Sequence, residues 1–505
     1  MKSIIKGKHK ILVIYSDIMS DKKGLLVYNV TTKSTLYHTE RPCMKYSKSQ
    51  TTCKAYALPN IQFESQTLTS FAGLVVFQKF FETIQFKSRL SKCFENLNHG
   101  KIFDRTTLFM QLIVHLLLGF RELKDSRYYK DDPLVKRLLG LKKIPDTATI
   151  SRALKDATNE SVDKLRHCLR EMVLTRLRLI TPSRLTLDFD GSVQSTKRRA
   201  EGSAVGFNKK KKGNRSYYPL FCTIAQTMQV LDFHHRPGNV HDSNGAKTFI
   251  LACIDAVQGI LPHTQIEVRM DSAFFSDEIV TALQERNIEF TLSVPFERFT
   301  ELKGMIEQRK RWKYLDGETS FFEADWKPKS WDTRFRFVFI RTRSKKQQKG
   351  PIQLDLFVPY EYGYEFKVII TNKTLRPKRI TAYHEGRGSQ ESIFGELKSH
   401  CHQDYIPVRS LYGNQMYLLA GLFAYNLVRE LQMQTTTPSR GTTAKRASLW
   451  VFEKVDTLRK TMILRAGRIT HPKRNLTLTI SANLWIKHRI VTLLDKIAYN
   501  AQVAN

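Results

Sequence analysis

The spacing of hydrophobic and polar residues follows two different patterns along the chain. Between about 68 and 178, apolar residues recur at three- and four-residue spacings, which predicts a helical region. From 184 to 295, short apolar runs alternate with helical patterns. The expected order in this part is three strands, a helix, a strand, a helix and a strand.

These alternating segments predict an α/β sheet. The order of strands and helices suits a ribonuclease-H-like core, which is the fold class that we expect here. The predicted strands cover residues 185–190, 218–226, 229–235, 266–270 and 288–294, and the predicted helices cover 246–257 and 277–286.

The segment from about 300 to 372 has a different character. Aromatic, strand-like runs follow a basic helix that ends near Arg311, so we predict a β-rich insertion. Helical pattern returns from about 389 to 431, and a Thr/Ser-rich linker follows at 432–448. The expected strands of the insertion are 321–322, 334–342, 352–358 and 365–372.

The charge of the chain indicates which kind of partner it binds. Lys and Arg number 82 against 47 Asp and Glu, which gives the 505-residue chain a formal net charge of +35. Such an excess repels itself unless a polyanion neutralises it, so nucleic acid is the expected partner. The seven cysteines form no CxxC pair, and the longest apolar run, 108–120, is too short to span a bilayer. We therefore expect a cytoplasmic, nucleoid-associated protein with no membrane partner.

Three acidic residues lie where metal-dependent chemistry would need them. Asp190 ends the first predicted strand, Asp271 ends the fourth, and Glu391 lies on the later helical pattern. Residues two apart share a strand face, so Asp188 is the alternative first acid. Asp190 is preferred because a glycine and a serine follow it and end the strand. The bland alternative for Asp271 is a turn or helix cap, and Arg269 is expected to pair with it or with DNA.

The helical wheel separates two glutamates. Tyr383, Arg387, Glu391 and Lys398 fall within roughly an 80° arc if one helix runs throughout, at about 100° per residue. Glu396 lies about 140° from Glu391 and is the weaker candidate. The alternative for such a pattern is an exposed charged helix face.

At this point the residues resemble a known family. The signature Tyr383, Arg387, Glu391, Lys398, together with segments 204–220 and 236–239, resembles the DDE transposases of bacterial insertion sequences. Within them the chain is similar to insertion-sequence group thirteen-eighty, which carries a Tyr-Arg-Glu-Lys signature. The resemblance covers about residues 65–490. The tyrosine and arginine are four apart here, whereas the family commonly places them three apart, where this chain has His384.

The resemblance implies a site and a reaction. Asp190, Asp271 and Glu391 would bind two Mg²⁺ ions, with Mn²⁺ as a substitute, and catalyse cut-and-paste transposition by hydrolysis at transposon ends and strand transfer. The partners would be double-stranded DNA with terminal inverted repeats and a target DNA, bound by a homodimer in a synaptic complex. The expected DNA-binding residues are Arg387, Lys398 and Tyr383, and, from a basic segment after the first strand, Lys209, Lys210, Lys211, Lys212 and Arg215.

The domains and the competing functions follow from this interpretation. One alternative is a catalytically inactive, transposase-derived DNA-binding protein, and another is a structure-specific nuclease without strand transfer. The predicted domains are an N-terminal tail of uncertain structure at 1–60, a helical DNA-binding region at 61–180, the first part of the ribonuclease-H-like core at 181–298, the β-rich insertion at 299–372, the core's catalytic helix at 373–433, and a linker with a C-terminal region at 434–505.

Overall fold

The structure of the protein is a computed structural model. The chain divides into two compact units, Met1–Glu64 and Ser65–Asn505, and every helix and strand below belongs to the second unit. Most of the predicted tail at 1–60 and the predicted strand at 352–358 lie outside the described residues. The residues that the structure describes are 58–95, 102–197, 199–206, 208, 211–241, 243–344 and 363–503.

The helical pattern of the first part is confirmed. Several of its helices begin at a side chain that accepts a backbone N–H, as Asp104, Asp132, Asp146 and Thr158 do. The elements are β1 (Leu68–Thr69), α2 (Leu74–Thr83), α3 (Phe86–Lys92), α4 (Arg105–Leu117), η1 (Leu123–Tyr128), α5 (Pro133–Leu139), α6 (Thr147–Lys155) and α7 (Asn159–Ile180).

A nine-stranded sheet follows, and its first part has the predicted order of strands and helices. Within it, β7, β6 and β2 are antiparallel neighbours, and β2, β8 and β9 run parallel. Parallel pairing needs a crossover, which α8 and α9 provide. The elements are β2 (Arg184–Gly191), β6 (Leu220–Ile224), β7 (Val230–His234), α8 (Ala246–Gln258), β8 (Gln265–Met270), η2 (Ser272–Phe274), α9 (Asp277–Glu285) and β9 (Glu289–Ser293).

The predicted insertion is rich in strands, and these strands extend the same sheet. β13 pairs with β9, so the full order is β10-β11-β12-β13-β9-β8-β2-β6-β7. Trp326 and Trp331 are buried in the core that this extension shares with the first part. The elements are η3 (Phe296–Arg298), α10 (Thr300–Glu307), β10 (Lys313–Asp316), β11 (Thr319–Trp326), β12 (Phe335–Arg343) and β13 (Tyr364–Thr371).

The last part of the chain returns to the sheet and then to the helical region. Three helical segments follow β13 almost without interruption, and α13 continues to Thr435, so the predicted linker begins later than expected. β14 pairs with β1 and β15. The elements are α11 (Pro377–Glu385), η4 (Gly386–Gly388), α12 (Ser389–Ser399), α13 (Leu411–Thr435), α14 (Val455–Leu458), η5 (Arg459–Ile463), β14 (Gly467–Thr470), η6 (Pro472–Arg474), β15 (Thr477–Ile480) and α15 (Leu484–Val503).

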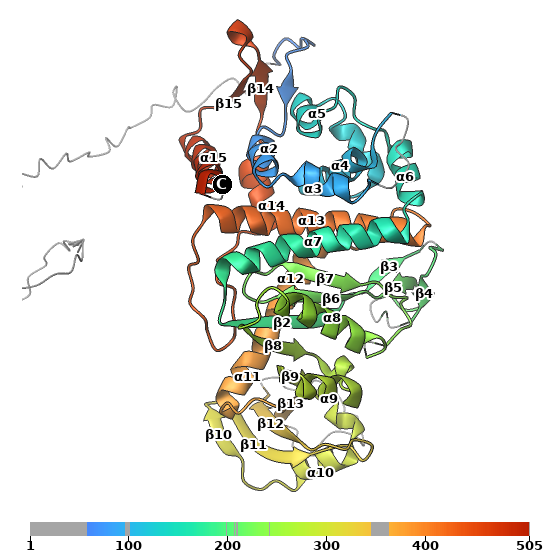
Figure 1. The fold of residues 1–505 in the computed structure, drawn as a ribbon, viewed down its shortest axis with the longest axis vertical. Coiled ribbons are helices and arrows are strands. Elements are labelled where there is room, and N and C mark those ends of the chain that lie inside the picture. Colours follow the sequence, from blue (N-terminus) through green and yellow to red (C-terminus); the bar gives the residue numbers. More distant parts are fainter. Residues whose placement is uncertain are drawn as a thin grey trace, which may run out of the picture. The chain divides into compact units, whose positions relative to one another are not determined.

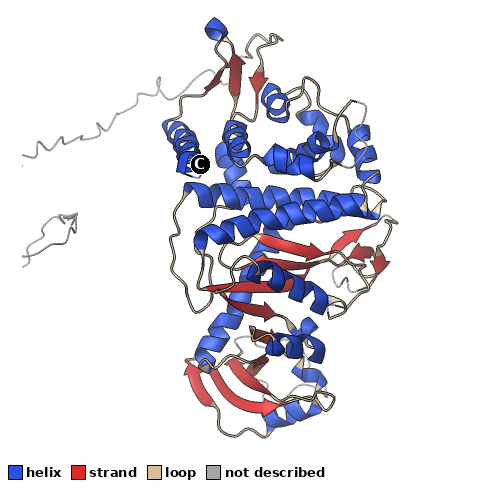
Figure 2. Ribbon diagram, in the orientation of Figure 1, coloured by secondary structure: helices blue, strands red, loops and turns tan. Residues whose placement is uncertain are grey.

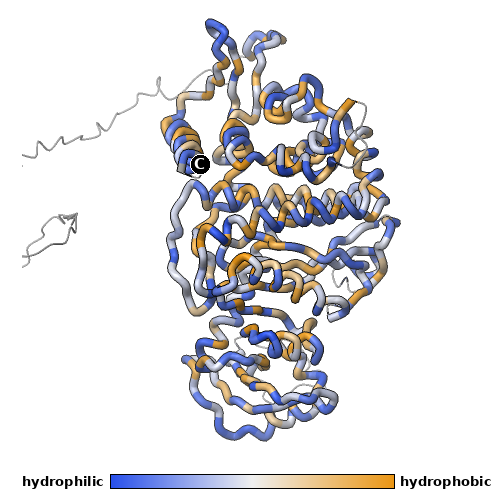
Figure 3. The backbone as a smooth tube through the Cα atoms, viewed as in Figure 1, coloured by the Kyte–Doolittle hydropathy of each residue, from blue (hydrophilic) through white to orange (hydrophobic). Residues whose placement is uncertain are grey.

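Two long helices, α7 and α13, lie side by side between the helical region and the sheet (Figure 1). Figure 2 shows mainly helices on one side of this pair and the nine-stranded sheet on the other. Hydrophobic positions recur along both helices and along the strands (Figure 3), and nearly every side chain of α13 is buried. Among the described residues, no helix is both long enough and apolar enough to cross a membrane.

Candidate functional site

Asp190 and Asp271 lie at the same edge of the sheet. β2 and β8 run parallel, and Phe189 of β2 is opposite Met270 of β8. Asp190 follows Phe189 directly, and Asp271 follows Met270 directly. Neighbouring strands are about 4.8 Å apart, which brings the two positions together. Asp271 also accepts the Ala273 N–H at 3.0 Å and caps η2. The cap that sequence offered as an alternative is therefore present, at a position that also faces the site.

Asp188 and Asp190 share a face of β2 at different depths. The Asp188 side chain is 1% exposed, and Arg269 donates two hydrogen bonds to it, at 2.6 and 2.8 Å. Burial raises the pKa of Asp188, and the Arg269 charge opposes this rise. Asp190 lies at the rim with 18% of its side chain exposed. Asp188 is buried and its charge is balanced by Arg269, so it is the poorer candidate for the first metal-binding acid. Arg269, which was expected to pair with Asp271 or DNA, pairs with Asp188.

Two side chains dock the later helices against the end of β2. Arg387 Nη1 donates to Asp190 Oδ2 at 3.0 Å, and Gln390 Nε2 donates to the Asp188 carbonyl at 3.0 Å. Glu391 follows directly and is exposed on the first turn of α12. The structure therefore brings the segments of all three predicted acids to one edge. Sequence analysis missed Gln390, although it is three residues from Arg387 and so on the same helix face.

The far end of α12 confirms the predicted orientation of Glu396. Its carboxylate is buried, and it accepts hydrogen bonds from Arg429 Nη2 at 2.5 Å and from the Val455 N–H at 3.0 Å. Lys398 lies two turns beyond Glu391 on the same helix and is half-buried. Its predicted contact with DNA stays a prediction.

Tyr383 lies in the interior. Its ring is 1% exposed and faces three cations, with Lys373 Nζ 4.3 Å, Arg269 Cζ 5.2 Å and Arg446 Cζ 5.7 Å from the ring centroid. Burial raises the pKa of the phenol well above its ordinary value. The structure therefore does not bring this side chain to a surface where DNA would contact it.

The neighbouring His384 anchors α11 to the sheet. Its ring nitrogens lie 3.0 Å from Thr291 Oγ1 and 2.8 Å from Ser293 Oγ, both on β9. Burial lowers the pKa of His384 well below its ordinary value, so the ring is neutral. This residue holds the position where the family commonly has its tyrosine.

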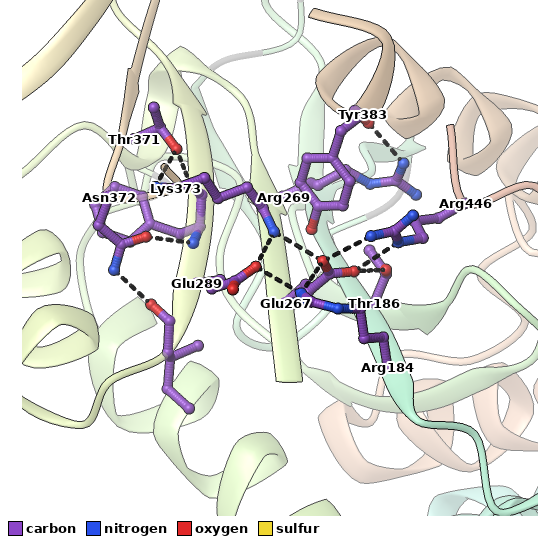
Figure 4. A network of polar contacts seen from close by, with 12 residues as sticks. Arg184, Thr186, Glu267, Arg269, Glu289, Thr371, Asn372, Lys373, Tyr383 and Arg446 are labelled. Carbon is purple, nitrogen blue, oxygen red and sulfur yellow. Dashed lines mark hydrogen bonds and ion pairs between the residues drawn. The ribbon is translucent and has the colours of Figure 1, made fainter. Parts of the chain in front are cut away.

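A buried polar network lies beneath the acidic edge (Figure 4). At its centre is Glu267 of β8, which accepts hydrogen bonds from Lys373 at 2.8 Å, from Arg446 at 2.8 and 3.0 Å, and from Arg184 at 2.9 Å. Burial acts to raise the pKa of Glu267, yet the bonds and charges of Arg446 and Lys373 lower it to about 2. Sequence analysis missed this network. The available signal was that Glu267 lies two and four residues before Arg269 and Asp271, on the same strand face.

The predicted basic segment is only partly described. Lys211 and Lys212 are exposed at a turn before β5 (Arg215–Tyr217). Arg215 is exposed at the start of β5 and donates to Ser203 Oγ at 3.0 Å, and its predicted contact with DNA stays a prediction. Lys209 and Lys210 lie outside the described residues. The strands of this sheet pair in the order β3 (Gln194–Thr196), β5, β4 (Ala204–Val205).

The acidic edge offers the donor type that a hard divalent cation prefers, namely carboxylate oxygens. Within the described part of the chain, no group of three or more His, Cys, Asp or Glu side chains is already gathered to hold a metal ion. The Arg387 guanidinium supplies a positive charge at Asp190 instead. The three acids therefore fit a divalent cation chemically, on condition that Arg387 releases Asp190 and the carboxylates converge.

The chain was compared with protein families, curated proteins and solved structures. Residues 55–502 match the family described as transposase DDE domain group 1. None of the curated proteins matches the chain. Among solved structures, a piggyBac transposase synaptic complex with hairpin DNA gives a TM-score of 0.38 at 11% identity, over 77% of this chain and 80% of that chain. A Mos1 transposase paired-end complex with the left transposon end gives 0.16 at 13% identity, over 39% and 61%. The Mos1 mariner paired-end complex with Mn gives 0.16 at 13%, over 41% and 67%.

Proposed function

Because the chain belongs to the DDE transposases of domain group 1, we propose that it catalyses metal-dependent cut-and-paste DNA transposition. It would hydrolyse DNA at the transposon ends and transfer the freed strands to a target. The observation that carries this proposal is the meeting of three segments at one edge. Asp190 and Asp271 lie next to the paired residues Phe189 and Met270 of two parallel strands. Arg387, at the start of the helix of Glu391, donates a hydrogen bond to Asp190.

Asp190, Asp271 and Glu391 would hold Mg²⁺, with Mn²⁺ as a substitute. When bound, the metal supplies the charge that activates a water or a 3′-hydroxyl and stabilises the leaving oxygen. Arg387 would exchange its bond to Asp190 for a phosphate of the transposon end, because a guanidinium binds carboxylate and phosphate in the same manner. Lys398, Lys211 and Lys212 would contact further phosphates.

The strand order β7-β6-β2-β8-β9, with its antiparallel first three strands and parallel remainder, supports a ribonuclease-H-like core. The signature residues support membership in insertion-sequence group thirteen-eighty. Paired terminal inverted repeats would require a homodimer in the synaptic complex.

We propose that the chain has the domain boundaries predicted from its sequence. The insertion at 299–372 would act within the same sheet as the core, since β13 pairs with β9. The helical region at 61–180 would bind DNA. Its α6 is capped by Asp146 and buries only Ile150 and Leu154, which leaves the rest of that helix accessible.

The test is cleavage of DNA that carries the gene's own flanks, in the presence of Mg²⁺. The informative variant is Asp271→Asn, and Asp316→Asn is its matched control, because both aspartates accept backbone N–H groups and asparagine can do so equally well. We expect wild type and Asp316→Asn to cut and join, and Asp271→Asn to bind DNA without cutting.

Other outcomes select the alternatives. Binding without cutting by wild type would favour the inactive DNA-binding protein, a function that the Arg387–Asp190 ion pair also suits. Cutting without joining of 3′-hydroxyl ends would favour a structure-specific nuclease.

A further inference from the structure

A segment distant in sequence packs against the turn that leads into α12, the helix of Glu391. We call residues 436–454, between α13 and α14, the strap. Arg269 Nη1 donates both to the Lys445 carbonyl and to the Tyr383 carbonyl, each at 2.8 Å. A Cβ added at Gly386 would lie 1.9 Å from the Lys445 carbonyl oxygen. The strap therefore lies directly against the junction of α11 and η4, one residue before Arg387.

The strap inserts a side chain into the buried network. Arg446 donates Nε and Nη2 to Glu267 at 2.8 and 3.0 Å, with only 13% of its side chain exposed (Figure 4). Its backbone has φ of 51°, in the left-handed region that non-glycine residues rarely adopt. Such strain persists only where the surrounding contacts impose it. Here the Arg446 N–H and Nη1 both donate to the Thr443 carbonyl, at 3.0 and 2.8 Å, and the guanidinium also contacts Glu267 and Tyr383.

The strap is also tied to the other side of the sheet. The Leu449 N–H donates to the Gln226 carbonyl at 2.9 Å, and the Gln226 side chain accepts the Thr186 N–H of β2 at 3.1 Å. Trp450 Nε1 donates to the Thr436 carbonyl at 3.0 Å and closes the strap on itself. One segment thus contacts the strand of Asp271, the turn beside the strand of Asp190, and the helix that leads to Glu391.

We propose that the strap positions the catalytic helix, and that Arg446 is its central positioning residue. By holding Glu267, Arg269 and Tyr383 together, it sets where Glu391 stands relative to Asp190 and Asp271. Arg446 contacts Glu267 and Tyr383, and Arg269 donates to the carbonyl of the neighbouring Lys445, so the effect of Arg446 on the site passes through these residues. This inference rests on the proposed function, because it concerns how the metal-binding acids of that function converge.

The experiment measures Mn²⁺ binding to the full chain in complex with DNA that carries the gene's own flanks, by electron paramagnetic resonance with the signal of DNA alone subtracted, together with thermal melting. Arg446→Gln is compared with Arg440→Gln, a matched change at an exposed arginine of the same strap. We expect Arg446→Gln to weaken Mn²⁺ binding by about tenfold or more, as loss of groups that orient metal ligands commonly does. Arg440→Gln should bind Mn²⁺ as wild type does, and Arg446→Lys should fall between the two.

Gly386→Ala provides a second variant that removes no charge. Its added methyl group would lie 1.9 Å from the Lys445 carbonyl oxygen and 2.1 Å from Arg269 Nη1, so it should separate the strap and Arg269 from the start of η4 and weaken Mn²⁺ binding in the same way. All binding is measured well below each variant's melting temperature, so that only folded protein is compared. If wild type binds Mn²⁺ and both variants bind it equally tightly, the strap does not position the site. If wild type itself binds no Mn²⁺, the proposed metal-dependent function fails first.

Discussion

At the scale of single residues, the site depends on depth along one strand. Asp188 and Asp190 point to the same side of β2, but Asp188 is buried whereas Asp190 is partly exposed. Its carboxylate is bonded twice by Arg269, whereas Asp190 has one bond from Arg387 at the rim. Loss of one charge should reduce the stability of the fold more when the ion pair is buried than when it is partly exposed.

We therefore predict opposite behaviour for two similar substitutions. Asp188→Asn leaves the Arg269 charge buried and should destabilise the fold by about 3–5 kcal/mol. Asp190→Asn removes a partly exposed pair and should cost less than about 1 kcal/mol, while abolishing DNA cleavage. Urea unfolding and a cleavage assay on both variants check this. A stable, inactive Asp188→Asn beside an active Asp190→Asn would reverse the assignment of the first acid.

Strand alternation was enough to place both aspartates on one face, and helical periodicity was enough to turn Glu396 away from Glu391. Neither pattern could reveal that Tyr383 is buried or that Arg269 pairs with Asp188. Those facts depend on which distant segments cover the strand, and a period of two or 3.6 residues carries no such information. The candidate acids were therefore predictable, and their partners were not.

At the scale of elements, the network around Glu267 joins β8, the end of β13 and the strap. It predicts a specific dependence of stability on pH. Glu267 has a folded pKa of about 2 against an ordinary value of 4.5. Because the folded pKa is lowered, this carboxylate stabilises the fold above about pH 4.5, and the stabilisation is lost as pH falls from 4.5 towards 2. The difference of 2.5 units corresponds to about 3 kcal/mol.

Acid unfolding of Glu267→Gln tests this dependence. The variant should be less stable than wild type at pH 7, because Lys373 and Arg446 lose their buried partner. The gap between the two proteins should narrow as pH falls below 4.5. Glu278→Gln, at an exposed glutamate paired with Lys247, is the control and should follow the wild-type curve. Curves for Glu267→Gln and wild type that stay parallel down to pH 2 would refute the role of Glu267.

The order of strands and helices from 184 to 295 was predictable from sequence, because each element has its own local pattern. The way the later elements join was not. β10 to β13 extend the central sheet through the pairing of β13 with β9, and the Thr/Ser-rich linker proves to be the strap that holds Arg446. Both features are contacts between segments far apart in the chain, which composition does not record.

At the scale of the whole molecule, a net charge of +35 must act through particular surfaces. The buried cations Lys373, Arg269 and Arg429 are already paired with carboxylates. Because these carboxylates balance their charges, the electric field outside the protein comes mainly from the exposed charges. Lys211 and Lys212 are exposed just before β5 of the small sheet β3-β5-β4, in the segment that follows the strand of Asp190. They are the described members of the segment that we expect to contact DNA phosphates.

The salt dependence of DNA binding measures that contribution. Each phosphate contact adds about 0.9 to the slope of log affinity against log salt concentration, so the double change Lys211→Gln and Lys212→Gln should lower the slope by about 1.8. Phosphate contacts carry no sequence information, so binding to transposon-end DNA and to unrelated DNA should weaken alike. The double change Lys313→Gln and Lys329→Gln, at exposed lysines of the sheet extension, is the control. An equal loss of slope in both double variants would mean that the charge of the molecule attracts DNA without a defined path, and that the segment after β2 has no special part in binding.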